Sequence, residues 1–187
     1  MGTDISSYVE IFDGERWSWA QGDLFPDNDP RYDKPWEPFP GRSDYLFGFL
    51  AGVRDRDVPQ IHPCRGLPVD LSPELREKFG FTFPDDCTHY RPSWSSARTC
   101  GCVYVHSGLF GHSWATGAEL VGFDFERTFR CPLAHGDARP TWLEPCEHPG
   151  DRITVAEYLG GWLDRFREIA ALTADPSHVR AVFAFDN

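Results

Sequence analysis

The C-terminal part of the chain constrains the fold more than any other segment. Thr154 and Glu157 have the spacing of a capping box, in which each side chain bonds a free backbone N–H group at the start of a helix. Over residues 154–173 an apolar stripe follows the helical period, and it consists of Leu159, Trp162, Leu163, Phe166, Ile169 and Ala170. Asp175-Pro176 ends this helix, and the apolar run VRAVFAFDN follows as a buried strand. A chain with this ending has to pack helices against a sheet.

Local signals predict further elements in the first half of the chain. Asp13-Gly14 separates two apolar and aromatic runs, as in a tight β-hairpin. Ser43 precedes a helical pattern, and Pro73 is suited to the first position of a short helix. The predicted elements are a hairpin over 3–20, a loop rich in Pro, Asp and Gly over 21–42, and helices over about 43–54 and 73–79.

The second half begins with weaker signals. Thr116 and Glu119 form another capping-box spacing, which predicts a short helix. We expect strands at 100–106 and in the segment that contains Phe123, Phe125 and Phe129. Together these elements predict an α+β fold, with a mainly antiparallel sheet, two longer helices at about 43–54 and 154–173, and long Pro- and Gly-rich loops. We expect a single domain over 1–187, in which the segment at about 81–111 is rich in Cys and His.

The charge of the chain restricts its partners. The 187 residues include 18 Lys and Arg against 29 Asp and Glu, a formal net charge of −11 at pH 7. Phosphate contacts depend on clustered basic residues, so we expect neither nonspecific nucleic-acid binding nor attachment to anionic membranes. No apolar segment approaches the ~20 residues needed to span a bilayer. The opening lacks a secretory pattern, so we expect a cytoplasmic protein whose cysteines stay reduced.

Cysteine and histidine recur in pairs separated by one residue. Residues i and i+2 of an extended strand face the same side, so each pair can offer two ligands to a tetrahedral Zn²⁺. A structural zinc site is therefore one expectation, with the ligands Cys87, His89, Cys100 and Cys102. The alternatives are buried or free thiols, or a disulfide between Cys131 and Cys146. No other cofactor is indicated.

Arginine and aromatic residues predict a ligand site. A guanidinium recognises phosphate or carboxylate with two hydrogen bonds, and an aromatic ring can stack on a base. We expect a small anionic ligand, phosphorylated or nucleotide-like, bound by Arg42, Tyr45, Arg65, His112 and Trp114. In a chain this acidic, the same arginines can instead form salt bridges with Asp and Glu.

Two other classes of function stay open. One is a hydrolase or transferase that acts on such a ligand, with His112, Glu119 or Asp4 as general acid or base. Asp4 and Asp186 would be neighbours if the first and last strands pair. The structural alternative is that Thr116 and Glu119 only cap a helix. The other class is an acidic interaction or inhibitor protein that occupies a basic surface of its partner.

Five segments, in order along the whole chain, carry a resemblance: MGTDISSYVE, RSDYLFGFLAGVR, CRGLPVDLSPEL, HSWATGAEL and VRAVFAFDN. Together they resemble an uncharacterised family of small hypothetical proteins of bacteria and their phages. Its members typically begin Met-Gly-Cys-Asp-Ile-His and end in a strand similar to Val-Phe-x-Phe-Asp-Asn. The resemblance implies a phage-related setting in a bacterial host cell, and a host protein among the partners. Thr3 and Ser6 replace the Cys and His of the family, so no metal site is expected on the first strand.

Overall fold

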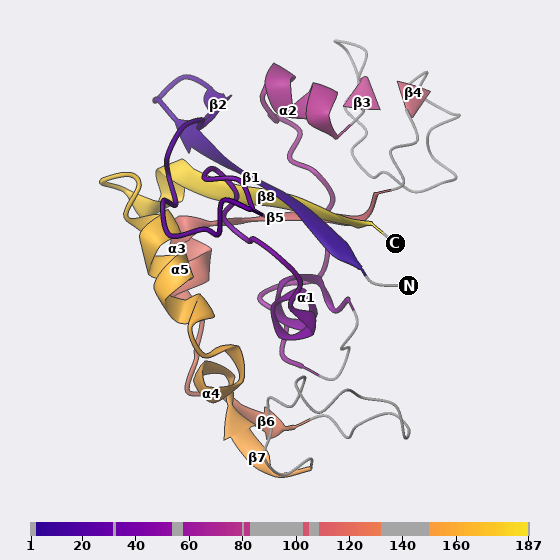
Figure 1. Ribbon diagram of the computed structural model, residues 1–187, viewed down its shortest axis with the longest axis vertical. Coiled ribbons are helices and arrows are strands. Elements are labelled where there is room, and N and C mark those ends of the chain that lie inside the picture. Colours follow the sequence, from indigo (N-terminus) through magenta and orange to yellow (C-terminus); the bar gives the residue numbers. More distant parts are fainter. Residues whose placement is uncertain are drawn as a thin grey trace.

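An antiparallel sheet with the strand order β2-β1-β8-β5 forms the centre of the protein (Figure 1). The computed structural model describes residues 3–31, 33–53, 58–79, 109–131 and 150–186, together with the backbone of 81–82 and 103–104. The four strands are β1 (Asp4–Phe12), β2 (Trp17–Trp19), β5 (Phe110–Thr116) and β8 (Val179–Asp186). The α+β prediction is confirmed.

The first and last strands pair along almost their whole length. Asp4 lies opposite Asp186, and the register continues to Ile11 opposite Val179. The predicted hairpin is confirmed as well, because β1 and β2 pair antiparallel, from Glu10 opposite Trp19 to Phe12 opposite Trp17. Gly14 in the turn has a φ of 103°, a conformation that favours glycine. The C-terminal strand is therefore an interior strand of the sheet, between β1 and β5.

Helices α1 (Asp44–Ala51), α3 (Gly117–Gly122), α4 (Val155–Leu159) and α5 (Trp162–Ala170) contribute to the larger apolar core. Phe183 and Phe185 of β8 belong to this core, in which Phe39 packs edge-on against Phe183 at a centroid distance of 5.9 Å. Helix α2 (Pro73–Lys78) lies on the opposite side of the sheet from α1 (Figure 1). There Leu75 and Phe79 share a second core with Val182. Because β8 is covered on both faces, its residues are almost continuously apolar.

The helix predicted over 154–173 is divided. Its start is correct, since the capping box of Thr154 and Glu157 is present, but α4 ends after Leu159. Gly160 has φ 54° and ψ −126°, which is not a helical conformation, and α5 begins at Trp162. The apolar stripe continues across the break, and for this reason the pattern alone predicted one helix.

The other helices begin where they were predicted. Helix α1 begins after Ser43, whose hydroxyl accepts the Leu46 N–H at 3.2 Å, and it is capped at Gly52, which has a φ of 64°. Its predicted range of about 43–54 was too long, because the described residues 52 and 53 are not helical. Within the described residues, none of the helices has the length and apolar character that crossing a membrane requires.

Short elements complete the described chain. One strand prediction is wrong in part, because Phe129 lies in a strand but Phe123 and Phe125 lie in the preceding turn, packed against Phe49. The short elements are β3 (Phe81–Thr82) paired with β4 (Val103–Tyr104), β6 (Thr128–Arg130) paired with β7 (Arg152–Thr154), and a 3₁₀ turn at Pro176–His178.

Irregular segments line both outer sides of the sheet. On one side β2 has only three residues and pairs with only part of β1. Next to the unpaired part of β1, loop 21–42 is bonded to the strand, because the Ser7 hydroxyl accepts the Phe39 N–H at 3.2 Å. On the other side, the Gly66 N–H donates to the His112 carbonyl of β5 at 3.0 Å, and the Arg65 N–H contacts the Ser113 hydroxyl at 3.4 Å.

Candidate functional site

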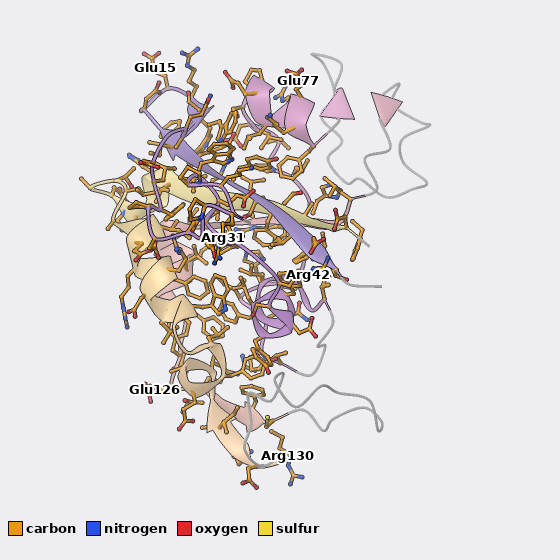
Figure 2. All side chains as sticks on the ribbon, viewed as in Figure 1. Glu15, Arg31, Arg42, Glu77, Glu126 and Arg130 are labelled. Atoms are coloured by element: carbon orange, nitrogen blue, oxygen red, sulfur yellow. The ribbon has the colours of Figure 1, made fainter. Side chains whose placement is uncertain are left out.

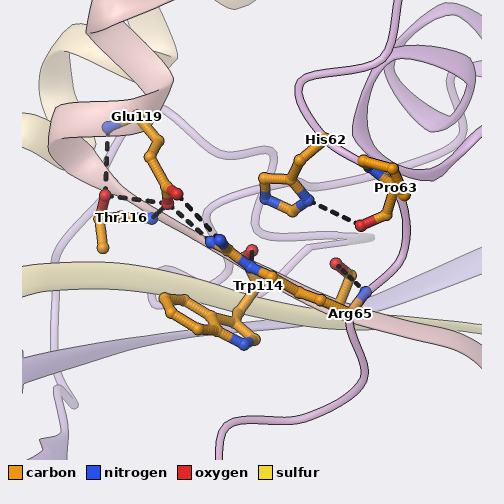
Figure 3. A network of polar contacts seen from close by, with 7 residues as sticks. His62, Pro63, Arg65, Trp114, Thr116 and Glu119 are labelled. Carbon is orange, nitrogen blue, oxygen red and sulfur yellow. Dashed lines mark hydrogen bonds and ion pairs between the residues drawn. The ribbon is translucent and has the colours of Figure 1, made fainter.

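The polar network at the start of α3 contains three of the predicted site residues, Arg65, Trp114 and Glu119 (Figure 3). The Thr116 hydroxyl accepts the Glu119 N–H at 3.1 Å, and Glu119 Oε2 accepts the Thr116 N–H at 2.8 Å, so the predicted capping box is confirmed. Arg65 comes from the segment before α2, and its Nη1 and Nη2 donate to the two Glu119 oxygens at 2.9 and 2.7 Å. The capping box is therefore also an ion pair between distant parts of the chain.

Trp114 supports the guanidinium of Arg65. The guanidinium carbon lies 3.6 Å from the centroid of the indole ring, and Nε donates to the Trp114 carbonyl at 3.0 Å. Burial raises the pKa of the Glu119 carboxyl, but hydrogen bonds from Arg65 and Thr116 and the charge of Arg65 outweigh burial and lower this pKa to about 2. Glu119 is therefore ionised at neutral pH and already occupies the guanidinium.

This network predicts a pH-dependent contribution to stability. We expect Glu119→Gln to lower the free energy of unfolding at neutral pH by about 1–2 kcal/mol, through the loss of charge-assisted hydrogen bonds. The pKa shift alone would suggest more, but the Glu119 side chain is 38% exposed and solvent screens the pair. Its folded pKa lies below the ordinary 4.5, so the contribution is complete above pH 4.5 and is lost as the pH falls towards about 2.

Urea unfolding at neutral pH and at about pH 3 measures this contribution. Glu157→Gln is the matched control, because Glu157 forms the same capping box with Thr154 and, in the described part of the chain, has no arginine partner. At neutral pH the Glu119 variant should lose more stability than the Glu157 variant. At about pH 3 the difference between the two losses should be smaller. Equal losses in both variants would mean that Arg65 contributes nothing.

The remaining predicted ligand residues lie apart from this network. Arg42 forms an ion pair with Asp4 through Nε and through Nη2, the latter at 2.7 Å. Figure 2 shows Arg42 at the start of β1, near α1 and far from the hairpin turn that carries Glu15. Tyr45 packs against Tyr158 at a centroid distance of 5.1 Å. Arg42 and Arg65 therefore both form salt bridges with carboxylates, as the alternative to a ligand site predicted.

The predicted acid and base groups also have separate surroundings. His112 is buried against the Phe79 ring, and burial lowers its pKa to about 4, so the imidazole is neutral at pH 7. Asp4 and Asp186 are neighbours as expected, and Asp186 Oδ1 accepts the Asp4 N–H at 3.2 Å. The Arg42 hydrogen bond lowers the pKa of Asp4. Among the contacts of the described residues, His112, Glu119 and Asp4 each have a different neighbour, which is Phe79, Arg65 and Arg42 respectively.

Two groups near this network were missed from the sequence. His62 lies beside the Arg65–Glu119 pair, with its Nδ1 3.1 Å from the Pro63 carbonyl, and burial lowers the pKa of the imidazole (Figure 3). Arg180 is 2% exposed and donates to Glu10 at 2.7 Å. No local motif predicts the role of Arg180, because Glu10 lies 170 positions away along the chain.

Loop 21–42 and residues of α5 together line an acidic cleft. From the sequence, the first of these segments was predicted only to be a loop. The volume of the cleft is about 470 Å³. The lining residues are Asp27, Asn28, Asp29, Asp33, Pro40, Leu159, Gly161, Trp162, Asp164, Arg165 and Glu168. Five of these are carboxylates and one is an arginine. The run DNDPRYD within the loop was the available signal.

Arg165 joins the two sides of the acidic cleft. Its side chain is 9% exposed, and Nη2 donates to Asp27 Oδ2 at 2.9 Å and to Asn28 Oδ1 at 3.0 Å. The guanidinium carbon lies 4.4 Å from the Phe25 ring centroid. The amide nitrogen of Asn28 donates in turn to the Lys34 carbonyl at 2.7 Å, so the loop is held in shape.

The carboxylates of the acidic cleft are only partly neutralised. Asp29 pairs with Arg31 at 2.7 Å, and Asp164 pairs with Arg167 at 2.6 Å, in both cases between exposed side chains. Within the described residues Asp33 has no salt bridge. Exposed pairs of this kind contribute little, about 0–1 kcal/mol, so their carboxylates remain available to another cation.

The described residues contain no group of three or more His, Cys, Asp or Glu arranged to hold a metal ion. The predicted zinc ligands Cys87, His89, Cys100 and Cys102, like Cys146, lie outside the described residues. Cys64 is a free thiol, whereas Cys131 is disulfide-bonded. The expectation that all cysteines stay reduced is therefore wrong for Cys131.

Comparisons with protein-family models, with curated proteins and with solved structures find no match to this chain.

Proposed function

We propose that the protein is a noncatalytic binding protein whose acidic cleft receives a basic side chain of a partner protein. The observation that carries this proposal is the lining of the acidic cleft, in which five carboxylates surround about 470 Å³ and the single arginine is already paired. The proposal belongs to the class of acidic interaction proteins that the net charge of −11 also favours.

Charge and aromatic chemistry both favour a cation in the acidic cleft. The side chains of Asp27 and Glu168 are 64% and 50% exposed, so their charges reach the solvent. A cleft lined by one sign of charge raises the local concentration of the opposite ion. Trp162 lines the same cleft, and the face of an indole attracts an ammonium or guanidinium group.

The anionic-ligand and enzyme hypotheses remain predictions with less support. Arg42 and Arg65 both hold a carboxylate, so an anion that approaches either of them meets Asp4 or Glu119. An enzyme that uses His112 and Glu119 would need a base and an acid in one place, and these two side chains have different partners. A cation in the acidic cleft, by contrast, meets carboxylates that are only weakly engaged.

A pair of short peptides tests the proposed function. One carries arginine between glycines, and the other carries citrulline, which has nearly the same shape without the charge. In calorimetry we expect the arginine peptide to bind about tenfold more tightly than the citrulline peptide, which corresponds to 1.4 kcal/mol. The binding should weaken as salt is raised, since salt screens exposed charges. Absence of binding by the arginine peptide would overturn the proposal.

Asp33→Asn locates the binding. Removal of this carboxylate should weaken the arginine peptide by about threefold to tenfold, the effect expected for one screened charge contact. Glu15→Gln is the matched control, because it removes one negative charge at the hairpin turn, away from the acidic cleft (Figure 2). Equal weakening in both variants would show that net charge alone attracts the peptide.

A further inference from the structure

One N–H donor in the lining of the acidic cleft has no hydrogen-bond acceptor among the described residues. Arg165 Nη1 is buried and, within the described residues, donates no hydrogen bond. It lies 3.3 Å from Glu168 Oε2, an ion pair outside hydrogen-bond geometry. The neighbouring Nη2 is fully engaged with Asp27 and Asn28. Arg165 therefore has a charge partner at Nη1 but no acceptor there.

A buried donor of this kind favours a ligand that brings an acceptor. A buried polar group without its hydrogen bond destabilises the protein, and an oxygen of the ligand would remove part of that destabilisation. The position is shielded by Glu168, whose side chain is 50% exposed and one turn further along α5. Because the Glu168 side chain is half exposed and its contact with Nη1 lacks hydrogen-bond geometry, the carboxylate can rotate away into solvent.

A cationic ligand gives Glu168 another partner at the same moment. The carboxylate would pass from Arg165 to the incoming cation, and Nη1 would donate to an oxygen of the ligand. The two features that this exchange requires, a cation and a carbonyl or carboxylate oxygen a few bonds away, occur together in an arginine or lysine residue.

We infer that the acidic cleft recognises a whole basic residue, with its side-chain cation among the carboxylates and its own main-chain oxygen accepting a hydrogen bond from Arg165 Nη1. This inference rests on the proposed function. The oxygen is a peptide carbonyl if the ligand is a polypeptide, or a carboxylate if it is a free amino acid. Arg165 is then a specificity-determining residue as well as the link between the loop and α5.

Three probes test the inference by calorimetry. Butylguanidinium offers the cation alone, N-acetylarginine methylamide offers the cation with peptide carbonyls, and free arginine offers the cation with a carboxylate. We expect the methylamide to bind about fivefold to tenfold more tightly than butylguanidinium, the ratio expected for one additional hydrogen bond. Tighter binding of the methylamide than of free arginine identifies a polypeptide ligand, and the reverse order identifies an amino acid.

Arg165→Lys tests which group donates. It keeps the positive charge but removes Nη1, so the preference for the methylamide over butylguanidinium should fall to about one. The melting curve shows whether the variant folds, and the wild-type ratio tests the inference even if the variant does not. Failure of every probe to bind would overturn the proposed function. Equal binding of the methylamide and butylguanidinium by the wild type, or an unchanged preference in folded Arg165→Lys, would overturn only the inference.

Discussion

Replacing Arg180 by methionine should lower the free energy of unfolding by about 3–5 kcal/mol, which is the effect of removing one partner of a buried ion pair. Arg180 is 2% exposed and Glu10 is 0% exposed. Nε of the guanidinium donates to Glu10 Oε2 at 2.7 Å, and Nη1 donates to Asp70 Oδ1 at 2.7 Å. Without Arg180, the Glu10 carboxylate stays buried and retains only the Ser72 N–H at 2.7 Å among its described partners.

Two control variants separate the buried charge from the lost contact. Arg42→Met removes the same kind of group from an exposed pair, since Arg42 is 60% and Asp4 51% exposed, and should lower the stability far less than Arg180→Met. The double variant Glu10→Leu/Arg180→Met removes both buried charges, so it should be more stable than Arg180→Met alone. Urea unfolding gives all three values. A loss from Arg180→Met no greater than that from Arg42→Met would contradict the argument.

Gly117→Ala should destabilise the protein by about 2–3 kcal/mol through overpacking. A Cβ atom at this position would lie 2.7 Å from Val179 Cγ1, 2.9 Å from Ala170 Cα and 2.9 Å from the Pro176 carbonyl oxygen. Two of these three atoms belong to the backbone, so the clash cannot be relieved by a change of rotamer. Helix α3 would have to move away from the end of α5 and from the start of β8.

Gly122→Ala is the matched control in the same helix. A Cβ atom there meets nothing within 4 Å, and alanine favours helix more than glycine does. This variant should be neutral or more stable by up to about 1 kcal/mol. If thermal or urea unfolding shows the same loss of stability for both variants, the close packing around Gly117 is not the cause of that loss.

Features set by neighbours in the chain were predictable from the sequence. The capping boxes that begin with Thr116 and Thr154 are present because each depends on residues only three positions apart. Two adjacent glycines, Gly160 and Gly161, indicated the break between α4 and α5. The prediction nevertheless followed the apolar stripe, which continues on both sides of them. Tertiary contacts had decided what the local pattern left open.

The candidate site depends on contacts that no local pattern contains. Arg65 meets Glu119 across 54 positions of the chain, and Arg165 meets Asp27 across 138. In a sequence rich in both charges, each arginine has many possible partners, and only the packed fold selects among them. The acidic cleft was missed for the same reason, because its two sides are distant parts of the chain that Arg165 joins.

The segments along the two outer sides of the sheet also determine how the protein can associate with other chains. An open strand edge is a template on which a further strand, from another copy or from an unfolded chain, can add and start aggregation. Here Phe39 is bonded beside β1, and Gly66 is bonded to the backbone of β5. A foreign strand that adds beside Ser7 or His112 must therefore first displace one of these two segments.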